Sequence, residues 1–326
     1  MNIFISNFFL DLFMNPEVER ILKKQGYAIV GKHSAVKLCH WLRESLLHNR
    51  PCYKQTFYGI QSHRCLQMSP AVNNCTQNCL FCWRFQGFNE VYLREVDDPG
   101  FIVDESIRQQ RRLIVGYKGE PRVSLERWEE AMNPKHAAIS LIGEPTLYPR
   151  LGELIEEFHK HGFTTFLVTN GTMPEVLENL DPLPTQLYVT VAAPNEDIYK
   201  KLLVPLIKNG WERLKRTLEL LPSLDTRKVI RHTLVRGWNM EGYEKDYAKL
   251  DMLAEPDFIE PKAYVFVGYS RERLSLENMP SHEEVRKFAN KLSQETGYNF
   301  ITEREDSRVI LLSKHTSEDK IKLKLE

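Results

Sequence analysis

The segment N-N-C-T-Q-N-C-L-F-C-W, residues 73–83, sets Cys75, Cys79 and Cys82 in the spacing C-x3-C-x2-C. Three thiolates this close together can each bind a different iron of a four-iron cluster, whereas a fourth cysteine would complete its coordination. One iron then stays open to a further ligand, as in catalytic metal sites rather than closed structural ones. The segment therefore predicts an iron–sulfur site that binds a substrate or cosubstrate.

A zinc ribbon or a set of unrelated buried thiols would account less well for the three cysteines. A zinc ribbon would need a second C-x2-C pair, and no cysteine follows Cys82. Unrelated buried thiols would not explain this spacing with the aromatic Phe81 directly before the last cysteine. With these residues the segment resembles the radical S-adenosylmethionine (SAM) enzymes, whose hallmark is C-x3-C-x-aromatic-C. The resemblance implies that SAM binds the open iron through its amino and carboxylate groups, and that the reduced cluster cleaves it to a 5′-deoxyadenosyl radical.

Composition sets broad limits on the protein. Its 326 residues suffice for one large domain or two ordinary ones. The 44 basic and 44 acidic residues cancel, so net charge alone does not indicate a nucleic-acid partner. All six cysteines lie between residues 39 and 82, which indicates metal-ligating thiolates in a reducing cytoplasm rather than a disulfide scaffold.

The first fourteen residues, M-N-I-F-I-S-N-F-F-L-D-L-F-M, are strongly apolar. They lack the basic start and the cleavage site of a signal peptide and are too short to span a bilayer. We expect a helix that docks on the body of the protein, or an upstream extension if translation starts at Met14. No later stretch of about 18 or more uncharged apolar residues occurs, so we expect a cytoplasmic protein without membrane spans.

Strands and helices alternate along the middle of the chain. Strand-like runs are 68–72, 137–142, 164–169, 186–191, 229–235 and 258–267, and helices are predicted over 106–115, 125–132, 150–160, 174–179, 198–203, 211–221 and 240–253. This alternation predicts parallel strands joined by right-handed crossovers, in a full or partial barrel or in an open doubly wound sheet. Radical SAM cores are typically partial (β/α)6 barrels, so the resemblance favours an α/β fold of this TIM-like type.

Two smaller regions flank the predicted barrel. The N-terminal region is basic and mainly helical, and the C-terminal region is a small α/β addition that ends in a frayed, lysine-rich tail from residue 314. The predicted domains are residues 1–67, 68–270 and 271–326. Within the flanking regions we predict helices over 16–25, 35–47 and 281–296, and strands over 298–302 and 308–312.

Chemistry in such a barrel is carried by the loops after the carboxyl ends of the strands. The cysteine loop follows the first strand. Gly143-Glu144-Pro145 follows the second, where glycine lets a ligand approach the backbone and proline keeps Glu144 extended. This turn resembles the superfamily's G-G-E-type motif, which hydrogen-bonds the SAM amino group, although Ile142 replaces the first glycine. By the same resemblance, residues that end the next strands reach the ribose, carboxylate or adenosine. The predicted SAM-binding residues are Phe81, Gly143, Glu144, Thr169, Asn170 and Thr190.

Three further cysteines, Cys39, Cys52 and Cys65, lie thirteen residues apart. Buried cysteines often pack as small apolar side chains. Each of these, however, lies near histidine, lysine or arginine, and neighbouring cations lower the pKa of a thiol and favour the ligating thiolate. Three ligands without a fourth would again leave one iron open. The residues alone leave two interpretations, packing side chains or a second iron–sulfur site.

Two open clusters in one SAM-type barrel, after a basic extension, resemble the archaeal tRNA 4-demethylwyosine synthase family from about Val36 to Val267. The resemblance implies that the first three cysteines of the chain bind a second [4Fe-4S] cluster and the last three bind the SAM cluster. It also implies a carbon–carbon lyase-type synthase that joins two carbons of pyruvate to N1-methylguanosine beside the anticodon of tRNA-Phe, giving 4-demethylwyosine in the wybutosine pathway. Lys54 falls where the family's proposed Schiff-base lysine lies, and a lysine whose pKa is lowered by other cations can condense with a keto carbon.

If the partner is RNA, the local distribution of basic residues is informative even though the net charge of the chain is zero. Residues 199–236 hold ten Lys/Arg against three Asp/Glu, and with the basic N-terminal region they could form a surface that follows RNA phosphates. The target base must leave the anticodon loop to reach the pocket, where aromatic side chains could stack on it. The predicted phosphate contacts are Lys200, Lys201, Arg213, Lys215, Arg216 and Arg231, and the stacking candidates are Trp83, Phe85, Tyr264 and Tyr269.

No phosphate-binding loop of a flavodoxin-like module occurs in the sequence, so the resemblance implies an external electron donor of the flavodoxin or ferredoxin type, and we expect a monomer. Two alternatives remain. Another two-cluster radical SAM enzyme, for RNA methylthiolation or peptide modification, would use the second set of cysteines for an auxiliary cluster. An RNA-binding protein with purely structural metal would not cleave SAM.

Overall fold

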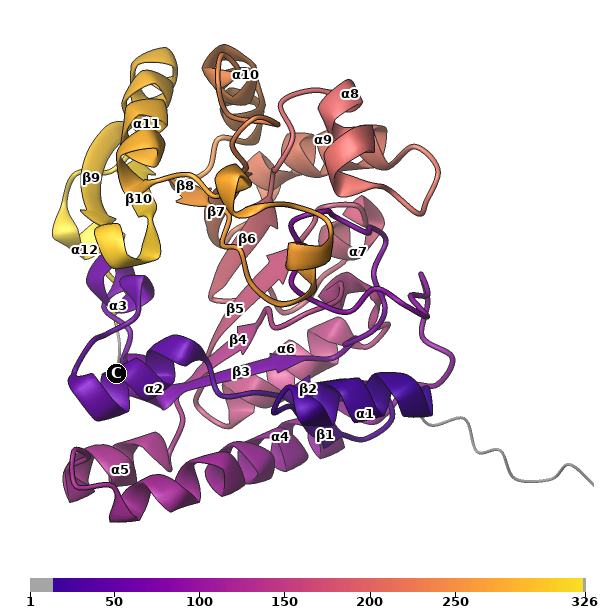
Figure 1. Cartoon of the computed structure of the whole chain (residues 1–326), viewed down its shortest axis with the longest axis vertical. Helices are drawn as coiled ribbons and strands as arrows, with labels where there is room; N and C mark the ends of the chain where they lie inside the picture. The colour runs from indigo at the N-terminus through magenta and orange to yellow at the C-terminus, as the bar shows by residue number, and fades with distance from the viewer. Residues whose placement is uncertain (1–13, 325–326) are drawn as a thin grey trace, which may run out of the picture.

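The computed structural model describes residues 14–324, and its centre is a sheet with six neighbouring parallel strands (Figure 1). These strands are β3 (Cys65–Ser69), β4 (His136–Ile139), β5 (Thr164–Thr169), β6 (Gln186–Thr190), β7 (Arg227–Leu234) and β8 (Phe258–Ala263). The predicted partial (β/α)6 barrel is confirmed. The predicted docked helix at the N-terminus falls, except for Met14, outside the described residues.

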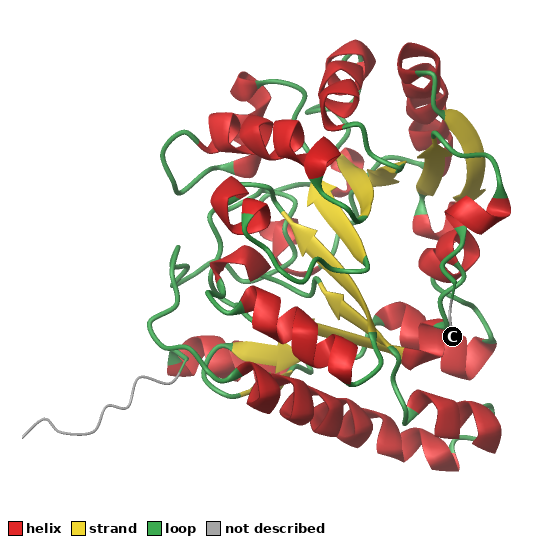
Figure 2. Cartoon of the chain, turned by 180° about the vertical axis from the view of Figure 1, so that it is seen from behind, coloured by secondary structure: helices red, strands yellow, loops and turns green. Residues whose placement is uncertain are grey.

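Helices lie along the connections between these strands (Figures 1 and 2). They are α4 (Pro99–Ile114), α5 (Leu125–Ala131), α6 (Leu151–Lys160), α7 (Pro174–Glu178), α8 (Glu196–Ile198), α9 (Gly210–Leu220) and α10 (Glu244–Ala254). Helix α4 begins earlier than predicted because the Asp98 side chain caps it, accepting a hydrogen bond from the Phe101 N–H, and Pro99 suits its first turn. None of the helices within residues 14–324 is long and apolar enough to cross a membrane.

Both faces of the parallel strands are buried, as is usual for such sheets. Leu167 and Leu187 point outward into the main core beneath the helices. One residue away in the same strands, Phe166 and Tyr188 point inward into a second apolar cluster. Aromatic side chains of helix α3 (Tyr53–Tyr58) pack against this inner face. Helix α3 therefore reaches the barrel interior, here called the lumen.

The N-terminal region is less helical than predicted. Helices α1 (Pro16–Lys24) and α2 (His40–His48) are present, but the start of the predicted helix over 35–47 is a strand. Strands β1 (Ala28–Val30) and β2 (Ser34–Val36) form a hairpin, and β2 pairs with β3. The hairpin turns at Gly31, whose φ of +58° suits glycine. The predicted domain boundary between residues 67 and 68 falls inside β3, so the extension and the barrel share a strand.

The C-terminal addition continues the same sheet. Helix α11 (His282–Thr296) leads to β9 (Asn299–Arg304) and β10 (Val309–Ser313). Within residues 14–324 the ten strands stand in the order β1-β2-β3-β4-β5-β6-β7-β8-β10-β9. The predicted boundary between residues 270 and 271 falls inside the short turn η6 (Gly268–Glu272).

The prediction of a frayed tail is wrong as far as residue 324. Residues Glu318–Ile321 form the short helix α12, and the Ile321 side chain is buried. Arg227 of β7 donates hydrogen bonds to the carbonyls of Lys320 (2.9 Å) and Ile321 (2.6 Å). The tail is ordered because it satisfies this guanidinium group and covers one end of the lumen.

Candidate active site

The loop that carries Cys75, Cys79 and Cys82 follows the carboxyl end of β3. Its backbone is held from two sides. The Cys75 N–H donates to the Glu90 carbonyl (3.0 Å), and the Leu80 N–H donates to the Leu202 carbonyl (2.9 Å). The second contact was not predicted, and it comes from a π-helical turn at Tyr199–Leu203. The protein itself thus fixes the three cysteine positions.

The three thiols suit a cluster with three cysteine ligands. Burial raises the pKa of Cys75 to about 11 and the pKa of Cys79 above its usual range, and neighbouring thiols add to both rises. Buried thiols become thiolates when a metal compensates their charge. Arg84 adds a buried Nη1 atom with no hydrogen-bond partner in the described part of the chain. No three metal-ligating side chains within residues 14–324 converge on a single ion, but the ligands of a four-iron cluster each bind a different iron.

The turns after β4 and β5 meet the cysteine loop. Glu144 is buried and extended, and its carboxylate accepts hydrogen bonds from the Thr169 hydroxyl (2.6 Å) and the Asn170 N–H (2.8 Å). Asn170 donates to the Thr76 hydroxyl (2.8 Å), and its Nδ2 lies 3.7 Å from Cys75 Sγ. With Thr146 also donating to it, the Glu144 carboxylate organises these turns. The peptide groups of the segment, not this side chain, are left to contact a ligand.

Two more of the predicted SAM-binding residues lie on either side of this region. Phe81 is half-buried in the cysteine loop and packs against the main core. Thr190 ends β6, where its backbone pairs with Arg231 of β7, and it shares the inner face of the strand with Tyr188. The structure thus places both at the barrel, on different elements.

Gly143 lies where the turn after β4 touches the cysteine loop. Its φ is +75°, and a Cβ atom there would stand 1.7 Å from the Ala71 carbonyl oxygen. We expect Gly143→Ala to lower the free energy of unfolding by about 3 kcal/mol, because backbone strain and a steric clash combine. The bound iron per protein should also fall, since the cysteine loop must move. Denaturant unfolding and iron analysis measure the two effects.

Gly242→Ala is the matched control for this substitution. Gly242 has a φ of +82°, and its Cβ would meet no atom within 4 Å. Only backbone strain of about 1 kcal/mol is then expected, with unchanged iron content. Equal losses of stability and iron in the two variants would show that the contact with Ala71 does not hold the cysteine loop.

Cys39, Cys52 and Cys65 come together at a second place. Cys39 and Cys52 directly precede α2 and α3, and Cys65 begins β3. All three are free thiols, and they lie close enough for Cys39 to raise the pKa of both Cys52 and Cys65 and for Cys52 to raise the pKa of Cys65. Lys54 does lower the pKa of each thiol, as expected of a neighbouring cation, but burial outweighs this effect and the net pKa values are raised. Burial is the largest effect and raises the pKa of Cys52 to about 11, and Lys54 opposes this rise only in part.

Lys54 lies on α3 in the lumen, two residues after Cys52. Its Nζ stands 4.7 Å from the ring centre of Phe166 and 4.3 Å from that of Tyr188. Burial, and then the charge of Arg231, lowers the pKa of Lys54. At a given pH, a larger fraction of a lysine in such surroundings is neutral than of a lysine on the surface, and the neutral amine is the nucleophile.

A charged cluster beside Lys54 was missed in the sequence. Glu260 of β8 is fully buried, accepts hydrogen bonds from two tyrosine hydroxyls of α3, and pairs with Arg231 at 3.0 Å. Lys262 of the same strand donates to the Ser307 carbonyl (2.6 Å), and burial lowers its pKa to about 8. The signal was the spacing of Glu260 and Lys262 in a strand-like run, which puts both charges on one face.

Comparisons with known proteins identify the family. A radical SAM superfamily model matches residues 69–250, and a model for wyosine base formation matches residues 253–314. A SAM-dependent tRNA 4-demethylwyosine synthase of Pyrococcus horikoshii is 57% identical over 305 residues, which cover 92% of this chain and 89% of the relative. This chain belongs to the tRNA 4-demethylwyosine synthase family. It is therefore a radical SAM enzyme that uses SAM with an iron–sulfur cluster, and the alternatives of a methylthiolase, a peptide-modifying enzyme and an RNA-binding protein with structural metal are excluded.

Two solved structures of the tRNA 4-demethylwyosine synthase family have the same fold. The structure of TYW1 with a lysine–pyruvate adduct bound is 41% identical, covers 95% of this chain and 100% of that chain, and has a TM-score of 0.87. The crystal structure of archaeal TYW1 is 38% identical over the same shares of the two chains, with a TM-score of 0.79.

The basic run 199–236 of this tRNA 4-demethylwyosine synthase family member does not form one surface. Arg231, predicted to contact RNA, lies in the lumen instead and pairs with Glu260, because β7 turns this side chain inward. The remaining predicted phosphate contacts pair with carboxylates outside the barrel. These pairs are Lys200–Glu196, Lys201–Asp197, Lys215–Glu212, Arg213–Glu175, Arg216–Glu175 and Arg216–Glu178.

The aromatic stacking candidates differ in exposure. Tyr264 is buried, and its hydroxyl donates to Ser270 (2.9 Å), so it is a core residue and cannot stack on a base. Trp83 is 38% exposed beside the cysteine loop. Phe85 packs against Tyr269 with the two rings tilted and their centres 5.2 Å apart. The prediction of a stacking role is therefore wrong for Tyr264 and stays a prediction for the three aromatic residues nearer the cysteine loop.

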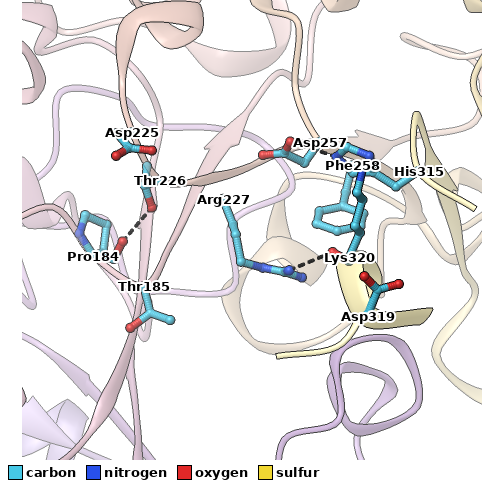
Figure 3. Close-up of a pocket in the computed structure, with 10 residues that line it drawn as sticks. All are labelled: Pro184, Thr185, Asp225, Thr226, Arg227, Asp257, Phe258, His315, Asp319 and Lys320. Atoms are coloured by element: carbon cyan, nitrogen blue, oxygen red, sulfur yellow. Dashed lines mark hydrogen bonds and ion pairs between the residues drawn. The ribbon is translucent and has the colours of Figure 1, made fainter. Parts of the chain in front are cut away.

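A pocket of about 500 Å³ lies between three barrel strands and the C-terminal tail (Figure 3). It is lined by residues at the amino ends of β6, β7 and β8 and by the C-terminal tail, including Arg227, Asp257 and Lys320. Asp257 forms an ion pair with Lys314 at 3.0 Å. This pocket marks where the C-terminal tail packs against the barrel.

Proposed function

We propose that this protein is a tRNA 4-demethylwyosine synthase, which joins two carbons of pyruvate to N1-methylguanosine beside the anticodon of tRNA-Phe. The observation that carries this proposal is the place of Lys54. It is a half-buried amine close to Cys39, Cys52 and Cys65, in a barrel whose relative was solved with a lysine–pyruvate adduct. The enzyme acts as a carbon–carbon lyase-type synthase and forms the tricyclic base of the wybutosine pathway.

Two [4Fe-4S] clusters serve this reaction. Cys75, Cys79 and Cys82 hold the one that binds SAM, and the first three cysteines of the chain hold the second. Bound SAM with its cluster supplies a radical that can take hydrogen from an unactivated methyl group, which no side-chain base could do. The chain orients SAM through the peptide groups after β4 and the polar ends of the next strands. The SAM contacts are Phe81, Gly143, Glu144, Thr169, Asn170 and Thr190.

Lys54 binds pyruvate covalently. Its neutral amine attacks the keto carbon, and loss of water leaves a Schiff base that fixes the substrate. Arg231 and Lys262 place two cationic side chains around the single carboxylate of Glu260, so a substrate carboxylate meets an excess of positive groups. The Phe166 and Tyr188 rings shield the amine from water.

The remaining partners meet the enzyme at its surface. The outer basic residues Lys200, Lys201, Arg213, Lys215 and Arg216 contact tRNA phosphates after exchanging their carboxylate partners. Exposed ion pairs of this kind contribute only about 0–1 kcal/mol each, so the exchange costs little. An external flavodoxin- or ferredoxin-type protein donates the electron. The monomeric enzyme acts in the cytoplasm, where thiols stay reduced.

The test is an anaerobic reaction with SAM, a reductant, uniformly ¹³C-labelled pyruvate and tRNA-Phe that carries N1-methylguanosine. Mass spectrometry of the nucleosides should find 4-demethylwyosine with two labelled carbons. The same tRNA without the N1-methyl group is the control and should give no product. Production of 5′-deoxyadenosine with no change in any nucleoside would assign the enzyme a different substrate.

A further inference from the structure

Arg84 lies beneath the cysteine loop, two residues after Cys82, and is only 2% exposed. Its Nη2 donates to the Gln77 carbonyl (2.8 Å) and to the side-chain oxygen of Asn78 (3.3 Å). Both partners belong to the segment between the first two cysteines of the loop. Its Nη1 is buried as well and has no hydrogen-bond partner among residues 14–324. The buried Arg84 side chain therefore has one donor nitrogen at the loop without an acceptor in the described part of the chain.

The charge of Arg84 has no carboxylate partner in the described part of the chain, where Gln77 and Asn78 are its only hydrogen-bond partners. Burying a charge without a counter-ion is costly. Both hydrogen-bond partners of Arg84 lie between Cys75 and Cys79, so the guanidinium group stands against the loop that carries these thiols. A cluster bound by thiolates carries negative charge, so it would supply the counter-ion that Arg84 lacks among the described residues.

The loop keeps its shape through separate contacts. The Asn89 side chain accepts from the Cys75 N–H (3.0 Å) and donates to the Cys75 carbonyl (3.3 Å). The Leu80 N–H is bound by the Leu202 carbonyl, and Arg273 donates to the Leu80 carbonyl from another side. Because these contacts brace the loop, the distinctive contribution of Arg84 is a buried positive charge with a free donor.

We propose that Arg84 is a positioning residue for electron transfer, whose guanidinium group donates toward the cluster held by Cys75, Cys79 and Cys82 and favours its reduced state. This inference rests on the proposed SAM site. The step is the gain of one electron from a low-potential flavodoxin- or ferredoxin-type donor, with no proton transferred and no bond broken. A positive charge held close to a buried centre favours the more negative state, so Arg84 raises the reduction potential.

The variants Arg84→Gln and Arg84→Lys test the proposal in the full chain. Glutamine removes the charge and keeps a donor for the Gln77 carbonyl, whereas lysine keeps the charge. The readout is the electron paramagnetic resonance signal that changes when SAM is added, followed in an anaerobic redox titration with dithionite. At a fixed potential, Arg84→Gln should lower the ratio of reduced to oxidised cluster about tenfold, equivalent to about 59 mV, and Arg84→Lys should stay within about threefold of the unchanged protein.

Arg273→Gln is the matched control. Arg273 also donates to carbonyls of the cysteine loop, those of Leu80 and Cys82, but it is only half-buried, so water screens its charge. Its substitution should change the ratio less than Arg84→Gln does. An equal change in both variants would make the effect a property of the loop and overturn the role of Arg84.

Iron and sulfide analysis separates the remaining outcomes. An unchanged ratio in Arg84→Gln with full iron loading overturns the proposal. Loss of iron in both Arg84 variants also overturns it, since Arg84 would then be a brace of the loop. If the unchanged protein has no signal that responds to SAM, the proposed function fails and this inference fails with it.

Discussion

Replacing Cys75, Cys79 and Cys82 together by alanine is expected to abolish 5′-deoxyadenosine formation and to leave one four-iron cluster per protein. SAM cleavage should stop because no thiolate would remain to hold an open-iron cluster at the strand ends. Iron should remain because the first three cysteines of the chain lie close together at a separate place, where α2, α3 and β3 begin. Iron and sulfide analysis after anaerobic reconstitution measures the content, and the resonance signal of the remaining cluster should respond to pyruvate.

The complementary variant, with Cys39, Cys52 and Cys65 replaced by alanine, is the control. It should also retain one cluster, but its signal should respond to SAM and not to pyruvate. 5′-Deoxyadenosine should still form, whereas the tRNA product should not. A first variant without any iron would reduce these three cysteines to packing side chains, and the enzyme would then hold a single cluster.

The barrel could be predicted because each of its signals is local. Each of the six parallel strands begins within three residues of its predicted start, and β5 has the predicted bounds. Buried parallel strands are short apolar runs between turn residues, and the sequence shows these directly. Strand β2 was missed because Ser34–Val36 becomes a strand by pairing with β3. The local sequence pattern does not predict this contact.

The residues of the candidate site also differ in how far the local sequence predicts them. Cys75, Cys79 and Cys82 were predictable because the three ligands lie on one loop. Glu260 and Arg231 were not, because their roles depend on which face of β7 and β8 turns inward after the barrel closes. A count of charges along the chain put Arg231 on a surface, since such a count does not distinguish the two faces of a strand. For the same reason the link between Arg227 and the tail was missed.

Lys54→Met is expected to abolish the trapping of pyruvate and to lower product formation on the order of 10³-fold or more, as is common when a covalent nucleophile is lost. Methionine keeps an unbranched stem between Phe166 and Tyr188 and removes only the amine. SAM cleavage without product should persist, because the cysteine loop is untouched. Reduction with borohydride in the presence of labelled pyruvate, followed by peptide mass spectrometry, measures the adduct directly.

Lys262→Met is the matched control, because Lys262 is a second half-buried lysine beside Glu260 and its pKa is lowered to about 8. Its amine donates to the Ser307 carbonyl at 2.6 Å, so it is already engaged, whereas the contacts of the Lys54 amine are with aromatic rings. Lys262→Met should therefore still trap pyruvate at Lys54, with weaker binding because one cation near the substrate carboxylate is lost. If Lys54→Met traps as much label as the unchanged protein and Lys262→Met traps none, the nucleophile is Lys262, and α3 serves only to fill the lumen.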